Sequence, residues 1–189
     1  MTPHFIYLHG FNSGPKAAKA AELQAFLASR QLPAAVVPEL HHRPAKAIAT
    51  VSQLIESAVT PPVLVGSSLG GYYATWLAQR YQLKAVLINP AVDAPALMRP
   101  RIGIEVVNPY TRDSYILDSQ HVEELRAIQL ETPPSEHLMV LLQTGDETLD
   151  YRKAETYYAG ATLVVEEGGN HRFEGFPDHC PAILEFARR

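Results

Sequence analysis

The residues best suited to chemistry lie in one short stretch, where the pentapeptide Gly-Ser-Ser-Leu-Gly at 66–70 follows the apolar run 62–65. A strand, then Gly-x-Ser-x-Gly, then a helix-forming segment is the sequence form of a nucleophile elbow. The two glycines leave room where strand and helix approach each other, and the serine takes a strained backbone conformation. Because the pattern also arises by chance in roughly one chain in twenty of this length, Ser68 is a candidate nucleophile whose partners must be sought elsewhere.

The base that would activate this serine is expected later in the chain. A serine hydroxyl is a poor nucleophile at neutral pH, so it needs a base within hydrogen-bond reach and a third group that orients the base. His171 stands in a glycine-rich loop after the apolar run 161–165 and is our candidate among eight histidines. His179 is expected at the start of the last helix, and His9 is expected to order the loop at Gly10 rather than act as the base.

The third group has three candidates, all of which follow the apolar run 138–142. Asp146 is preferred, because it lies immediately after the predicted strand. Asp150 is a natural N-cap for the following helix, since aspartate is a favoured capping residue, and Glu147 is a weaker option. The order nucleophile, acid, histidine is the one that α/β-hydrolases use, and Asp146 fits its middle position.

Two backbone N–H groups are expected to stabilise a negatively charged oxygen during catalysis. One belongs to Leu69, directly after the candidate nucleophile, and the other to Phe11, in the loop after the first predicted strand. Gly10 would let the backbone approach a substrate closely. An ordinary strand-to-helix turn is the alternative interpretation of this loop, and its occurrence together with the elbow favours an oxyanion hole.

Apolar periodicity predicts six short strands that alternate with helices. The strands are expected at residues 4–8, 35–38, 63–65, 84–90, 138–142 and 161–165. The helices are expected at residues 16–30, 44–58, 69–81, 121–129, 151–158 and 178–189. Prolines and mixed polarity argue against one long element in the segment 91–119. This alternation predicts the α/β class, with a parallel sheet covered by helices on both faces and the candidate residues at the carboxyl ends of its strands.

Length and composition fit a single domain over residues 1–189. The net charge of −4 and the scattered basic residues give no reason to expect a nucleic acid or an anionic membrane as a partner. The single cysteine, Cys180, excludes an internal disulfide and suits a reducing cytosol, so we expect a cytoplasmic location. We see neither a signal peptide nor a membrane-spanning segment, and the oligomeric state is left open.

The sequence predicts no cofactor and no metal site. The adjacent His41 and His42 would point to opposite sides of a strand, which does not suit a shared metal ion, and there is no glycine-rich phosphate loop. Asp93, Asp113 and Asp118 are scattered through the irregular segment and are expected to be solvated.

Four motifs in order carry a resemblance to a known family, and together they are more specific than any one of them. They lie at residues 9–13, 66–71, 145–151 and 169–173. The chain resembles the small bacterial YqiA/YcfP-like esterases of the α/β-hydrolase superfamily. The resemblance implies a cytoplasmic serine esterase with a Ser68–Asp146–His171 triad. It also implies a reduced sheet that lacks the first two strands of the full hydrolase fold, with six strands in the order 2-1-3-4-5-6.

The leading hypothesis is hydrolysis of small or medium acyl esters, or of acyl-CoA thioesters, through an acyl-enzyme. An amide or peptide hydrolase with the same triad is one alternative, and a non-catalytic hydrolase-like binding or regulatory module is another. The segment 91–129 follows the fourth predicted strand, where this fold carries its cap, so we expect a small partial lid. Its apolar residues are equally consistent with an acyl pocket and with packing onto the sheet.

Overall fold

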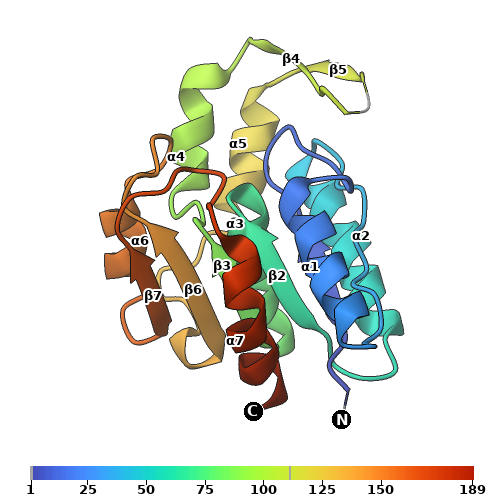
Figure 1. Ribbon diagram of the computed structural model, residues 1–189. Coiled ribbons are helices and arrows are strands. Elements are labelled where there is room, and N and C mark those ends of the chain that lie inside the picture. Colours follow the sequence, from blue (N-terminus) through green and yellow to red (C-terminus); the bar gives the residue numbers. More distant parts are fainter. Residues whose placement is uncertain (1, 111) are drawn as a thin grey trace.

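A five-stranded parallel sheet forms the centre of the protein, for which a computed structural model describes residues 2–110 and 112–189 (Figure 1). The order of its strands is β1-β2-β3-β6-β7. They are β1 (Phe5–Leu8), β2 (Val63–Ser67), β3 (Ala85–Ile88), β6 (Leu138–Gln143) and β7 (Thr162–Glu166). Every residue of the first four strands is buried, because helices cover both faces of the sheet. The predicted α/β class and parallel sheet are therefore confirmed.

The predicted count of six strands was wrong, because the segment 35–38 forms only one isolated bridge, between Ile6 and Val36. Val36 exchanges two backbone hydrogen bonds with β1, of 2.8 and 2.9 Å. The next residue that would donate toward β1 is Pro38, which has no N–H group. The outer edge at Ala35 is covered by the side-chain amide of Gln24, through hydrogen bonds of 2.8 and 2.9 Å. The observed sheet therefore differs from the implied order 2-1-3-4-5-6, because the predicted edge strand is reduced to this bridge.

Helices lie on both faces of the sheet and close two separate apolar cores. One face is covered by α1 (Ala18–Ser29) and α7 (Phe176–Arg188), which also pack against each other. The other face carries α2 (Pro44–Ser57), α3 (Leu69–Tyr81) and α6 (Tyr151–Tyr157). Proline at the first position of α2 needs no hydrogen-bond partner for its nitrogen and has the backbone angle that a helix start requires.

The segment 91–119 contains several short elements, in agreement with the expectation that it would not form one long one. They are α4 (Ala94–Met98), a 3₁₀ turn (Arg99–Arg101) and an antiparallel hairpin of β4 (Glu105–Val107) and β5 (Ser114–Ile116). The helix α5 (Ser119–Arg126) follows, and a second 3₁₀ turn (Ser135–His137) leads into β6. Figure 1 shows the hairpin at the top, above the end of the sheet toward which the strands run.

The apolar residues of this segment divide between exposure and the core. Met98 and Leu117 are buried. Six others are exposed, namely Leu97, Ile102, Ile104, Val107, Tyr110 and Ile116.

In the part of the chain that the structure describes, none of the helices has the length and apolar character that a membrane crossing requires.

Candidate active site

Ser68 lies on a strained turn between β2 and α3, as the motif predicts. Its backbone angles are φ 54° and ψ −118°, which a residue with a side chain rarely adopts. A Cβ atom on Gly66 would lie 2.3 Å from the carbonyl oxygen of Gly70, and one on Gly70 would lie 2.1 Å from that of Leu8. Both glycines are therefore needed for the strand, the turn and the helix to approach this closely.

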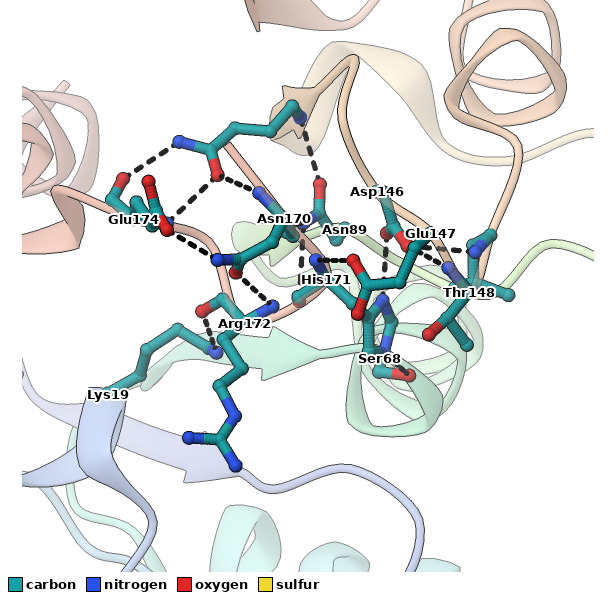
Figure 2. Close-up of polar contacts among 12 residues, drawn as sticks. Lys19, Ser68, Asn89, Asp146, Glu147, Thr148, Asn170, His171, Arg172 and Glu174 are labelled. Carbon is teal, nitrogen blue, oxygen red and sulfur yellow. Dashed lines mark hydrogen bonds and ion pairs between the residues drawn. The ribbon is translucent and has the colours of Figure 1, made fainter. Parts of the chain in front are cut away.

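Three predicted side chains meet at the carboxyl ends of the strands (Figure 2). The His171 Nε2 atom lies 3.1 Å from the Ser68 Oγ atom, and its Nδ1 atom lies 2.8 Å from the Asp146 Oδ2 atom. A carboxylate only accepts hydrogen bonds, so His171 carries its proton on Nδ1 and presents the lone pair of Nε2 to the serine. This is the tautomer in which histidine can take the serine proton.

The Asp146 carboxyl group is almost completely enclosed, with 2% of its side chain exposed. Burial raises the pKa of this carboxyl, but the hydrogen bond from His171 and the N–H groups of Leu149 and Thr148 outweigh burial and lower the pKa below its ordinary value. Each backbone bond, from N–H to the Oδ1 atom, measures 2.8 Å. Asp146 is therefore ionised at neutral pH and fixed in orientation by bonds on both oxygens.

The two other candidate acids take different places. Asp150 is the N-cap of α6 and accepts a hydrogen bond from the Arg152 N–H at 3.1 Å. Glu147 accepts the backbone N–H of His171 at 2.9 Å, so it contacts the main chain of this residue rather than the imidazole. Among the three candidates, Asp146 is the one whose carboxylate is hydrogen-bonded to the His171 ring in the described part of the chain.

Two buried amides that sequence reasoning did not identify hold the His171 loop (Figure 2). Asn89, which follows β3, donates to the carbonyl oxygens of Asn170 and His171 at 3.0 and 3.3 Å and accepts the Gln143 N–H at 3.0 Å. The side-chain oxygen of Gln143 accepts the N–H groups of Asn170 and Glu174 at 3.2 and 2.9 Å. The only sequence signal is a single amide residue at the end of each of two apolar strands.

The loop after β1 reaches the nucleophile through its glycine. A Cβ atom on Gly10 would lie 3.3 Å from the Ser68 Cβ atom, so the backbone passes directly beside the serine. The N–H groups of Phe11 and Leu69 have no hydrogen-bond acceptor among the residues that the structure describes. His9 is buried and accepts the Leu40 N–H at 3.2 Å, so it joins two loops.

The histidine pair lies behind this loop. His41 and His42 belong to a loop, and their ring centroids are 4.3 Å apart, so the two rings do not point to opposite sides as they would on a strand. His42 stacks on Tyr115, with ring centroids 4.0 Å apart, and its Nδ1 atom lies 3.0 Å from the His121 Nε2 atom. Within the described residues, no group of three or more histidine, cysteine or acidic side chains is arranged to hold a metal ion.

The expectation that Asp118 is merely solvated was also wrong. It caps α5, and Arg43 binds both of its oxygens at 2.7 and 2.6 Å. This bidentate pair lowers the pKa of the Asp118 carboxyl well below its usual range. Asp93 likewise caps α4 by accepting the Ala96 N–H at 3.2 Å.

Two further residues lie outside the site. His179 belongs to the first turns of α7, and its Nε2 atom pairs with Glu166 at 3.0 Å. Cys180 is fully buried, and burial raises the pKa of its thiol to about 11. Within the described structure, His179 is therefore engaged with Glu166, and the Cys180 thiol donates to the Phe176 carbonyl oxygen at 3.7 Å.

Solved structures with the same fold extend over almost the whole chain. An α/β-hydrolase domain-containing protein 10 from mouse matches with a TM-score of 0.74 and 17% identity, covering 98% of this chain and 89% of its own. The esterase domain of a Rhodothermus marinus protein has a TM-score of 0.72 at 19% identity, with coverage of 100% and 87%. A monoacylglycerol lipase from Paleococcus ferrophilus has a TM-score of 0.71 at 16% identity, with coverage of 98% and 95%. These likenesses show an α/β-hydrolase fold.

A sequence family also matches almost the entire chain, over residues 4–188. It is described as an uncharacterised protein family, UPF0227, and it bears out the resemblance to YqiA/YcfP-like proteins. This chain belongs to the UPF0227 family.

Proposed function

We propose that this protein is a serine esterase that hydrolyses small acyl esters through an acyl-enzyme. The observation that carries the proposal is the hydrogen-bonded series from the Asp146 carboxylate through His171 to the Ser68 hydroxyl, with separations of 2.8 and 3.1 Å. Structures of an esterase domain and of a monoacylglycerol lipase share the fold, which adds support. The single buried cysteine is consistent with our expectation of a cytoplasmic enzyme.

Acylation begins when the Ser68 oxygen attacks the ester carbonyl while His171 Nε2 takes the hydroxyl proton. The carbonyl oxygen becomes negatively charged and accepts hydrogen bonds from the N–H groups of Phe11 and Leu69. Asp146 stabilises the imidazolium that forms. His171 then gives the proton to the departing alcohol oxygen, the bond between this oxygen and the acyl carbon breaks, and the acyl group remains on Ser68.

Deacylation repeats these steps with water as the nucleophile. His171 takes a proton from water, the resulting hydroxide attacks the acyl carbon, and the carboxylic acid leaves as the proton returns to Ser68. A thiol leaving group would pass through the same acyl-enzyme, so thioesters are a second substrate class for the same residues. Acylation and deacylation both require the His171 tautomer that carries its proton on Nδ1, and Asp146 stabilises this tautomer.

We also propose that the segment 91–129 serves as a fixed partial lid. Arg43 binds Asp118 at its base, and the Tyr72 hydroxyl donates to the Leu125 carbonyl oxygen at 2.9 Å from within the core. Hydrogen bonds to the body of the protein at both ends of α5 favour a stationary cover over one that opens by a large movement.

Hydrolysis of p-nitrophenyl acetate and butyrate by the purified protein tests the proposal, with the matching p-nitroanilides and CoA thioesters as further substrates. We expect turnover of the esters, little or none of the anilides, and loss of activity in Ser68→Ala. Substitution of the neighbouring Ser67 by alanine is the matched control and should retain most of the activity. A folded wild-type protein that hydrolyses no ester or thioester would overturn the proposal.

A further inference from the structure

A small pocket lies beside the candidate nucleophile, between the loop after β1, the histidine pair and the hairpin. Its lining includes Gly10, whose backbone passes beside Ser68, and Leu69, which follows Ser68 in the sequence. His41, His42 and Tyr115 also line it. The volume open to small groups is about 40 Å³. Since one water needs roughly 10–15 Å³ by this measure, the pocket admits only a few non-hydrogen atoms. A long acyl chain does not fit it.

The pocket presents polar side chains among apolar ones, but no charged side chain. Among its described lining residues there is no aspartate, glutamate, lysine or arginine. Its three histidines are neutral at pH 7, because burial lowers the pKa of His9, His41 and His42, the last to about 4. Nearby His41, His121, Arg43 and Lys46 lower the pKa of His42 further. A neutral group that forms hydrogen bonds therefore suits this pocket better than an anion or a cation.

A series of hydrogen bonds sets the tautomer of His42. Arg43 neutralises the Asp118 carboxylate, which lies 2.8 Å from the His121 Nδ1 atom. The Asp118 N–H also lies 3.1 Å from that nitrogen, but an unprotonated Nδ1 would place its lone pair against the closer carboxylate. His121 therefore donates through Nδ1 and accepts through Nε2, so the His42 Nδ1–H donates to it at 3.0 Å.

The Nε2 atoms of the two adjacent histidines consequently differ, since one can accept a hydrogen bond and the other can donate one. His42 keeps a lone pair on Nε2, which has no hydrogen-bond partner among the described residues. The Nδ1 atom of His41 accepts the Arg43 N–H at 2.9 Å, so its proton is on Nε2. One acceptor and one donor on neighbouring rings match a hydroxyl group, which both donates and accepts a hydrogen bond.

We propose that this pocket binds a hydroxyl group of the substrate, with His42 as the acceptor and His41 as the donor, so that the enzyme prefers short hydroxylated esters. The inference rests on the proposed esterase function. It deepens that function by making the loop 41–43 and the hairpin the specificity determinants, while Ser68, His171 and Asp146 carry out the reaction.

Two pairs of isosteric esters test this inference and distinguish the two sides of the ester bond. On the alcohol side, 2-hydroxyethyl butyrate is compared with propyl butyrate. On the acyl side, methyl 3-hydroxybutyrate is compared with methyl 3-methylbutyrate. We expect kcat/KM to favour the hydroxylated member by about tenfold in at least one pair, the range that hydrogen bonds in a partly open site provide.

His42→Phe keeps a ring to stack on Tyr115 but removes both nitrogens. We expect it to reduce the preference, measured as the ratio of kcat/KM for the two members of a pair, to within about twofold of unity. His137→Phe, in the 3₁₀ turn before β6, is the matched control and should retain the preference. If His42→Phe does not fold, as judged from its melting curve, the exposed His41→Phe provides the test and should also weaken the preference.

The outcomes separate the two proposals. Equal rates for both members of both pairs, in a wild-type enzyme that depends on Ser68, would overturn the hydroxyl site and leave the esterase function intact. A preference that persists in His42→Phe and His41→Phe would do the same. Absence of all ester hydrolysis in folded protein would overturn the esterase function, and the hydroxyl site with it.

Discussion

The two sides of the candidate site are built in different ways. On the side of the acid and the base, the loop 168–174 is held by the buried side chains of Asn89 and Gln143, and Gly145 donates to the Gly168 carbonyl oxygen at 2.7 Å. On the pocket side, the side-chain amide of Asn108 in the hairpin donates to the Ser13 carbonyl oxygen in the loop after β1, at 3.1 Å.

This difference matches what each side would do during catalysis. A base must lie within a few tenths of an ångström of its productive position before the substrate arrives, and buried strand ends provide that rigidity. A specificity pocket can be assembled from surface loops and a hairpin, because exchanging those segments leaves the reacting groups in place. The comparison predicts that substitutions on the first side reduce kcat, whereas those on the second change the choice of substrate.

The largest effect is expected from Asp146→Asn. An amide would donate to His171 or leave its Nδ1–H without an acceptor, so the tautomer that serves Ser68 is no longer favoured. We expect kcat on p-nitrophenyl butyrate to fall by roughly 10³- to 10⁴-fold. Asp150→Asn is the matched control, because asparagine also caps helices well, and it should retain most of the activity. Equal losses in the two variants would contradict the assignment of the acid.

An intermediate effect is expected from Asn89→Ala, which frees the carbonyl oxygens of Asn170 and His171. Displacement of the base by about 1 Å can cost about 10²-fold, so we expect kcat to fall by roughly 10- to 100-fold while KM changes little. Buried groups left without partners should also lower the free energy of unfolding by roughly 1–3 kcal/mol.

Steady-state kinetics at a temperature where Asn89→Ala is fully folded separates these two effects. Denaturant unfolding measures the stability loss independently. If the variant changed KM and left kcat unaltered, the positioning role of Asn89 would have to be abandoned.

The smallest effect is expected on the pocket side, where substitution of Asp118 should change the melting temperature in a pH-dependent way. Its folded pKa is lowered, so the unfolded chain binds a proton at higher pH than the folded chain does. The stabilising contribution is therefore present above the ordinary aspartate pKa of about 4 and is lost as the pH falls through that value toward the folded pKa. Asp118→Asn should melt below the wild type at pH 6, and the difference should narrow at pH 3.

Arg43→Gln removes the other partner of the same ion pair and should show the same narrowing. Melting curves recorded between pH 6 and pH 3 measure both variants, and activity per folded molecule on p-nitrophenyl acetate should change little. A melting-temperature difference that stays constant across this pH range would show that the ion pair does not contribute to stability.

Local patterns predicted the positions of the candidate triad residues better than those of the residues that hold them in place. The elbow at Ser68 and the loop at His171 are each short and follow an apolar strand, so strand order alone brings them to one edge of the sheet. Asn89 and Gln143 have no such pattern, because a lone amide after a strand is common in loops and its partner is distant in sequence. The predicted strand at 35–38 was overestimated, since apolar composition outweighed the missing donor of Pro38.

The pocket beside Ser68 could not be predicted from local sequence patterns either, because the residues that form it are distant in sequence. His42 and His121 are 79 positions apart and meet only because the segment after β3 folds back over α2. The six exposed apolar residues of the segment 91–119 also resemble pocket residues by composition, but none of them lines the pocket beside Ser68, whereas the half-buried Tyr115 does. Chemical type alone cannot separate these cases, because exposure depends on which loops pack together.

The most direct measurement of the central claim is labelling of the native protein with a fluorophosphonate, followed by fragmentation mass spectrometry of the modified peptide. We predict a single adduct on Ser68, none on the adjacent Ser67, complete loss of labelling in Ser68→Ala and strongly slowed labelling in His171→Ala. Folded protein that remains unlabelled, or an adduct that persists in Ser68→Ala, would contradict the account.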